Sequence, residues 1–216
     1  MAKPLRLLRL LVAPLSAALL VLLTVLPAPA QAATDPLVAA RWQAAWNTYR
    51  FYEFLTAPLP ITGRSRVERD ISIEINAPVE HVFDAYSDFE NHLGIHPFLR
   101  QVITHRDRTE NGVRLVDLTA VEDVPIAGLP VSSETHAQQR LHRDELFYET
   151  DSWTLPNVVT HQRISFEDLG QGRTRVTEHL VFEASILLID FTVTNGVSSH
   201  QQTQAGLKEA IESGEL

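Results

Sequence analysis

Residues 73–84 read IEINAPVEHVFD, and this stretch decides the fold that we expect for the chain. Ile71, Ile73 and Ile75 alternate with polar residues, which predicts a strand with one buried face. Pro78 suits the first turn of a helix because its fixed φ is helical and its missing N–H would have no partner there. Apolar residues then recur at helical spacing through Tyr86. The stretch therefore predicts a strand that turns directly into a short helix.

The rest of the chain reads as a second short helix, a run of strands and a long helix. The second short helix begins at 88–91 and ends near 94–97, where Gly and Pro occur. Alternating apolar and polar residues, separated by turn residues, predict further strands at 98–106, 113–122, 132–141, 145–154, 158–167 and 173–184. The closing helix is expected at about 191–212. This order is typical of an α+β fold in which a curved antiparallel sheet wraps a terminal helix.

Two further motifs follow the first stretch, Ser87-Asp88-Phe89-Glu90 and Ile95-His96-Pro97. With them, residues 69–212 resemble the START-like superfamily, also called SRPBCC or Bet v 1-like, which includes polyketide cyclases, dehydrases and lipid-transport proteins. Ile95 replaces the Trp that is usual in this family. The resemblance implies a helix-grip fold with a six- to seven-stranded sheet, which holds apolar or amphipathic small molecules between the sheet and the last helix. Fold alone does not decide function, because the superfamily also contains hormone receptors, aromatases and oxygenase subunits.

The last predicted helix carries two polar residues in the middle of an apolar face. Spacings of four and three place these residues on one side of it: Val193, Val197, His200, Gln204, Leu207 and Ile211. A buried imidazole and a buried amide need hydrogen-bond partners, which sheet side chains or water can supply. Alternatively, they orient a ligand in an apolar cavity. This second reading makes Val197, His200 and Gln204 candidate ligand contacts.

Three more candidate ligand contacts come from outside that helix. Glu178 shares the more apolar face of its strand with Val176 and Leu180, where a carboxylate is costly unless paired, or else the register differs from the expected one. Trp153 is either a cavity wall or ordinary core, and His96 belongs to the His-Pro element of the family motif. The apolar stretch 124–130 is expected to be a loop and a possible gate at the cavity mouth.

The sequence favours binding without a cofactor, and no residue is assigned a catalytic role. Cysteine is absent, so thiol chemistry and thiolate metal sites are excluded. His92 and His96 have the spacing of a helical metal pair, but Pro97 breaks the helix and we expect no metal. The alternative is an aromatase- or cyclase-type enzyme, in which His200 or Glu178 acts as general acid or base on a polyketide-like carbonyl substrate.

The front of the chain predicts export. Lys3, Arg6 and Arg9 precede an apolar run at 10–26, and Ala30-Gln31-Ala32 fits a signal-peptidase site. We therefore expect a signal peptide at 1–32, cleaved after Ala32 or Ala33, and a secreted or cell-envelope protein. An uncleaved anchor is the alternative, since about 17 apolar residues lie at the short limit for a membrane span.

The negative charge of the mature chain excludes some classes of binding partner. Removing three basic residues with the signal leaves 15 Lys and Arg against 27 Asp and Glu, a formal charge of −12. Such a surface repels phosphate backbones, so nucleic acid is not expected as a partner. Anionic headgroups are unfavourable for the same reason, and we expect no stable membrane insertion of the mature chain. The expected partner is an apolar small molecule or lipid, and the oligomeric state stays open.

An amphipathic helix is expected ahead of the domain. Within residues 36–55, Val38, Trp42, Ala45, Trp46 and Tyr49 form an apolar stripe. The stripe either packs on the domain surface or serves as a lid or a docking helix for a partner. We therefore divide the mature chain into a helix and linker at 33–66 and a START-like domain at 67–216.

Overall fold

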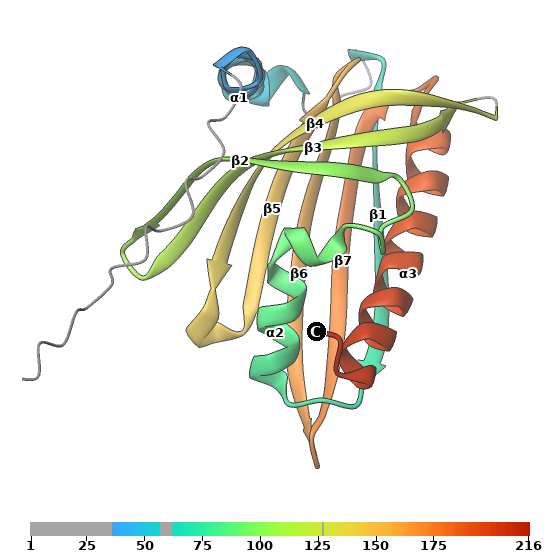
Figure 1. Ribbon diagram of the computed structural model, residues 1–216. Helices are drawn as coiled ribbons and strands as arrows, with labels where there is room; N and C mark the ends of the chain where they lie inside the picture. The colour runs from blue at the N-terminus through green and yellow to red at the C-terminus, as the bar shows by residue number, and fades with distance from the viewer. Residues whose placement is uncertain (1–35, 57–61, 127) are drawn as a thin grey trace, which may run out of the picture. The chain divides into compact units, whose positions relative to one another are not determined.

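One antiparallel sheet organises the chain, which is described here from a computed structural model (Figure 1). The structure describes residues 36–56, 62–126 and 128–216, without side-chain detail at 49–56. The predicted signal peptide and its cleavage site therefore lie outside the described residues, as does the side chain of Tyr49. The seven strands lie in the order β1-β7-β6-β5-β4-β3-β2. Consecutive strands are therefore neighbours in the sheet except for β1 and β2, which lie at opposite edges, and β1 pairs with β7 instead.

The elements follow the predicted order. The helices are α1 (Pro36–Thr56), α2 (Val79–Ser87) and α3 (Ile189–Ser213), with short 3-10 helices η2 (Phe89–His92) and η3 (Arg143–Glu145). The strands are β1 (Arg64–Ile75), β2 (Leu99–Glu110), β3 (Val113–Ile126), β4 (Leu129–His142), β5 (Phe147–Thr154), β6 (Val158–Gly170) and β7 (Arg173–Ser185). The α+β helix-grip fold is thus confirmed. In the described part of the chain, each helix is too short or too polar to cross a bilayer.

The 73–84 stretch folds as its pattern predicts. β1 ends at Ile75, and the carbonyl of Pro78 accepts the N–H of Val82 at 3.0 Å in the first turn of α2. Ile75 and Val82 are fully buried. The turn between them is held from β7, because the hydroxyl of Thr174 donates to the carbonyl of Ala77 at 2.8 Å.

The sheet curves around α2 and α3 (Figure 1). We call the side that faces α3 the inner face; in β7 it carries Glu178, Leu180 and Phe182. A Cβ added at Gly196 of α3 would lie 2.5 Å from the Phe182 ring, so glycine permits a close approach of helix and sheet here. Leu207 and Ile211, from the predicted stripe, are 0% and 4% exposed.

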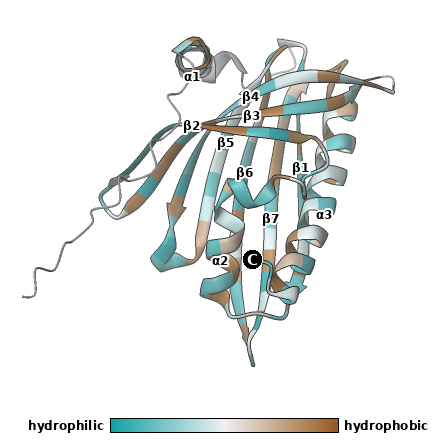
Figure 2. Cartoon of the chain, in the orientation of Figure 1, coloured by the Kyte–Doolittle hydropathy of each residue, from teal (hydrophilic) through white to brown (hydrophobic). Residues whose placement is uncertain are grey.

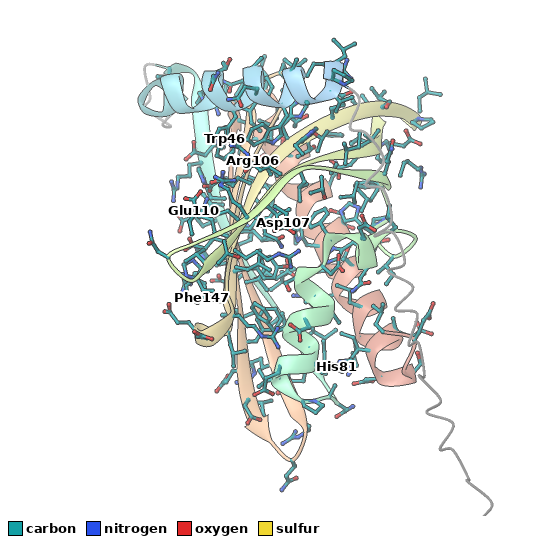
Figure 3. All side chains as sticks on the ribbon, turned by 60° about the vertical axis from the view of Figure 1, so that its left-hand side comes forward. Trp46, His81, Arg106, Asp107, Glu110 and Phe147 are labelled. Atoms are coloured by element: carbon teal, nitrogen blue, oxygen red, sulfur yellow. The ribbon has the colours of Figure 1, made fainter. Side chains whose placement is uncertain are left out.

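Helix α1 packs on the other side of the sheet, which we call the outer face. Trp42 and Trp46 stack with ring centroids 5.6 Å apart and pack on Val159. Val159 pairs with Glu183, the neighbour of the inward-facing Phe182, and neighbouring strand residues point to opposite faces. Figure 3 shows Trp46 beneath α1 with Arg106 of β2 nearby. The predicted packing of this helix on the domain surface is confirmed for the part whose side chains are described.

A hydrogen-bonded chain of two imidazoles and one hydroxyl lies on the outer face under α1. Thr119 Oγ1 is 2.8 Å from His105 Nε2 and 2.9 Å from His136 Nδ1. The ring of Trp42 lies 5.9 Å from that of His105, and its Nε1 donates to the carbonyl of Ala137 at 3.0 Å. Burial lowers the pKa of both histidines. The docked helix therefore covers neutral imidazoles.

Two segments that were expected to lie outside the strands belong to the sheet. The linker that was expected to extend to residue 66 is wrong from Arg64 onward, because Arg64 of β1 already pairs with Ser185 of β7. The expected loop at 124–130 is also wrong, since Val124 pairs with Val131 and Ile126 with Leu129 at the end of the β3–β4 hairpin. Elsewhere, hydrophobic and hydrophilic residues alternate along the strands, as Figure 2 shows, and that pattern located the sheet.

Candidate functional site

A cavity of about 830 Å³ lies between the inner face of the sheet and the first half of α3. The end of the β3–β4 hairpin, the β5–β6 turn and α3 supply most of its wall. Apolar side chains dominate the lining, among them Phe98, Val124, Val131, Val158, Phe182 and Phe191. Ionisable side chains in the wall include His96, Glu122 and His200. A concave site whose surface is mainly apolar, with polar side chains among the lining residues, is typical of a small-molecule site.

His200 of α3 is paired with a buried carboxylate. Its Nδ1 lies 2.6 Å from Oε2 of Glu178, whose side chain is 4% exposed. The Tyr86 hydroxyl donates to Oε1 of the same carboxylate at 3.3 Å. Burial lowers the pKa of His200, but the charge of Glu178 and its hydrogen bond outweigh burial, so the net pKa is raised. Burial, followed by the charge of Glu178, raises the pKa of Tyr86 well above its ordinary value.

His96 and Glu122 are also ionisable groups in the cavity wall, and each favours its neutral form. Burial, with the charge of His200 as the next cause, lowers the pKa of His96 to about 3. Burial raises the pKa of Glu122, although a 2.6 Å hydrogen bond from the Thr135 hydroxyl partly opposes it. The charge of Glu122 also raises the pKa of His200, so the protonation states of the three groups are linked.

The six predicted contacts fall into distinct positions. His200 and His96 line the cavity, and Glu178 lies behind His200. Trp153 is at the cavity edge, but its ring packs on the outer face against Val159 and the α1 tryptophans.

The remaining two predicted contacts, both on α3, lie apart from the cavity wall. Val197 packs against the cluster around Leu180 and Phe182. Gln204 is 3% exposed, and its amide nitrogen has no hydrogen-bond partner among the described residues. Which of the six residues bind a ligand stays a prediction.

Sequence reasoning missed Glu122. It is the last residue of the strand predicted at 113–122, and no ligand contact was expected of it. Alternation from Leu118 and Ala120, both buried on the inner face, was the signal that pointed to it.

The two histidines with the spacing of a metal pair have different partners. His92 Nε2 contacts the carbonyl of Tyr86 at 2.9 Å, whereas His96 Nδ1 accepts the N–H groups of Phe98 and Leu99 at 3.3 and 3.2 Å. In the described part of the chain, no group of three or more His, Cys, Asp or Glu side chains is placed to hold a metal.

Comparisons with known proteins agree with this fold. The family model described as polyketide cyclase / dehydrase and lipid transport matches residues 66–212. A protein of Thermus thermophilus is 17% identical, with a TM-score of 0.55 over 69% of this chain and 100% of its own. The comparison with curated proteins finds no match.

Two further solved structures widen the comparison. The Zhui aromatase/cyclase from Streptomyces sp. R1128 is 14% identical, with a TM-score of 0.52 over 68% of this chain and 96% of its own. A START superfamily protein from Mycobacterium smegmatis is 15% identical, with a TM-score of 0.53 over 68% of this chain and 97% of its own. At such identities the structures show a common fold, while the family model covers most of the sequence. The chain therefore belongs to the polyketide cyclase / dehydrase and lipid transport family.

Proposed function

We propose that the mature protein binds an apolar or amphipathic small molecule, or a lipid, in the cavity between the sheet and α3. The observation that carries the proposal is the cavity itself, about 830 Å³ with a mainly apolar wall. Burying apolar surface there stabilises a complex by roughly 25 cal/mol per Å² before the costs of association. The family includes lipid transport, which agrees with such a role.

Filling the cavity is expected to weaken binding. Thr160 lies in the cavity wall on β6, so Thr160→Trp places an indole in the space that the ligand needs. Phenylnaphthylamine, a neutral dye that fluoresces in apolar surroundings, should bind the wild type and bind this variant at least roughly tenfold more weakly, a loss of about 1.4 kcal/mol. Fluorescence titration measures the difference.

Ser165→Trp is the matched control for this test. Ser165 lies on the same strand but is exposed on the outer face, so its variant should bind the dye as the wild type does. Equal dye affinity in wild type and Thr160→Trp would count against the cavity as the binding site. Circular dichroism of both variants checks that the sheet is intact.

Export is the second part of the proposal. The basic front end, the apolar run and the Ala30-Gln31-Ala32 site support a cleaved signal and a role outside the cytoplasm. Expression of the whole chain in a bacterium, followed by intact mass measurement, should give a product that begins at Ala33 or Thr34. A retained N-terminus with the protein in the membrane fraction would instead favour an anchor.

The paired His200 and Glu178 favour one alternative function, an aromatase- or cyclase-type enzyme. A carboxylate that orients an imidazole inside an apolar cavity is suited to proton transfer on a carbonyl substrate. Incubating the protein with a ketone in D₂O discriminates the two functions. Exchange of the hydrogens next to the carbonyl, lost in His200→Gln, would favour the enzyme, and unchanged ketone would favour binding alone.

A further inference from the structure

Three ionisable side chains of the cavity wall come from three separate elements. His96 lies in the loop after η2, Glu122 in β3 and His200 in α3, and all of them line the same cavity. The hydrogen bonds that each one already makes decide which of its atoms remain for a ligand.

The backbone fixes the tautomer of His96. Its Nδ1 lies 3.3 and 3.2 Å from the N–H groups of Phe98 and Leu99, and both of these can only donate. Nδ1 must therefore be unprotonated, and the proton of the neutral ring is on Nε2. His96 thus offers a ligand one N–H donor and no acceptor.

Glu178 fixes the orientation of His200. The 2.6 Å contact to the carboxylate keeps a proton on Nδ1, so Nε2 is the ring nitrogen left over. Among the described residues, this Nε2 has no hydrogen-bond partner. The buried carboxylate favours the imidazolium, in which Nε2 also carries a proton. His200 is then a second donor, and its charge is balanced by Glu178.

Glu122 is the third donor. Its Oε2 accepts the Thr135 hydroxyl at 2.6 Å, and no Lys or Arg contact to it is recorded among the described residues. Burial in the wall favours protonation of Glu122 and outweighs the opposing charge of His200, so the carboxyl group favours its protonated form, which has one O–H to donate.

The lining has no spare cation for an anionic ligand. Among the described residues of the wall, one carries a Lys or Arg side chain, and it is Arg41. Its guanidinium already makes two bonds to Glu134, at 2.8 and 2.7 Å. A carboxylate in this cavity would be desolvated with no unpaired positive charge beside it, which is costly. A hydrocarbon would leave the donors without acceptors.

We infer that the ligand is a neutral apolar molecule whose polar end is a carbonyl oxygen, as in a ketone or an ester. The inference rests on the proposed binding function. The carbonyl oxygen has two lone pairs and accepts from the donors contributed by His96, Glu122 and His200, while the alkyl part contacts the apolar wall. The same groups discriminate against a ligand whose polar end is a carboxylate.

Three probes with the same chain length test this ligand class. Methyl nonyl ketone, undecane and undecanoate compete with phenylnaphthylamine for the wild-type protein at neutral pH. The ketone should displace the dye at a roughly tenfold lower free concentration than undecane, the equivalent of one hydrogen bond. Undecanoate should be weaker than the ketone.

Variants of one donor separate the ligand class from cavity binding. Glu122→Leu should reduce the preference for the ketone over undecane, because His96 and His200 remain as donors, and should still bind undecane. Glu122→Gln retains a donor and should keep the full preference. Asp123→Leu is the matched control, because Asp123 is adjacent on β3 and binds Arg100 at 2.9 Å.

The two possible failures can be told apart. A tenfold preference that persists in Glu122→Leu, or undecanoate binding more tightly than the ketone, overturns the inference and leaves cavity binding in place. A wild type that binds neither the dye nor any probe overturns the proposed function and this inference with it.

Discussion

Glu178→Ala is expected to lower the free energy of unfolding by about 3–5 kcal/mol, the usual cost of removing one partner of a buried ion pair. The substitution leaves the imidazole of His200 and the hydroxyl of Tyr86 without the carboxylate that both now contact. It also leaves a small void beside Leu180. Urea denaturation at pH 6 and a constant ionic strength measures the loss.

A double variant distinguishes the cost of an orphaned charge from the value of the pair. Glu178→Leu combined with His200→Leu replaces both members by apolar side chains, which is often neutral or stabilising. We expect the double variant to be more stable than Glu178→Ala by at least about 2 kcal/mol. If Glu178→Ala alone lowers the free energy of unfolding by less than about 1 kcal/mol, the pair of His200 and Glu178 is exposed to solvent and not buried.

The sign of the pH dependence gives a further check on this pair. The pKa of His200 is raised in the folded protein, so the pairing stabilises fully below the unfolded value of about 6.5. That contribution is lost as the pH rises through the folded pKa. The difference between wild type and Glu178→Gln should therefore be larger at acid pH than at alkaline pH, and the opposite trend would contradict the assignment.

Most of the fold could be predicted because its patterns are local. The alternation that ends at Ile75 and the stop at Pro78 require only neighbouring residues, and the structure places both as expected. The stripe of α3 correctly put Leu207 and Ile211 against the sheet. The start of β1 was missed because Arg64 and Arg66 carry charges that look like a linker, whereas they lie in a strand and Arg66 pairs with Glu183 across the sheet.

The site could be predicted only in part, because its hydrogen bonds join distant segments. The sequence indicated that Glu178 faces inward, yet nothing local shows that His200 meets it, 22 residues away. The outer-face chain was hidden by a β-bulge between Thr104 and Arg106, which interrupts the alternation of β2. Through it His105 contacts Thr119 while the next residue, Arg106, contacts Asp117 on the same face.

Trp42→Ala is expected to cost about 3–5 kcal/mol of the free energy that holds α1 on the outer face. Trp42 is 3% exposed, donates to Ala137 and stacks on Trp46, so the truncation removes a large apolar contact and a hydrogen bond together. Limited proteolysis should then cut within α1 faster than in the wild type. Gln43→Ala, on the exposed side of the same helix, should leave the rate nearly unchanged.

Acid should weaken the same contact in the wild type. Burial lowers the pKa of His105 and His136, opposed by the charges of Asp117 and Glu134 respectively, while Arg41 of α1 lowers that of His136 further. Undocked, both imidazoles return to about 6.5, so docking is fully stable above that pH and is lost as the pH falls below it.

The shared hydroxyl gives this pH dependence a structural reason. Thr119 has a single proton to donate, so it can bridge two neutral rings, whereas two imidazolium rings would both donate to it and leave that proton unused. Proteolysis of α1 should therefore accelerate between pH 7 and pH 5 in the wild type. In Trp42→Ala, where the rings are already uncovered, it should change far less, and an equal acceleration in both proteins would refute this account.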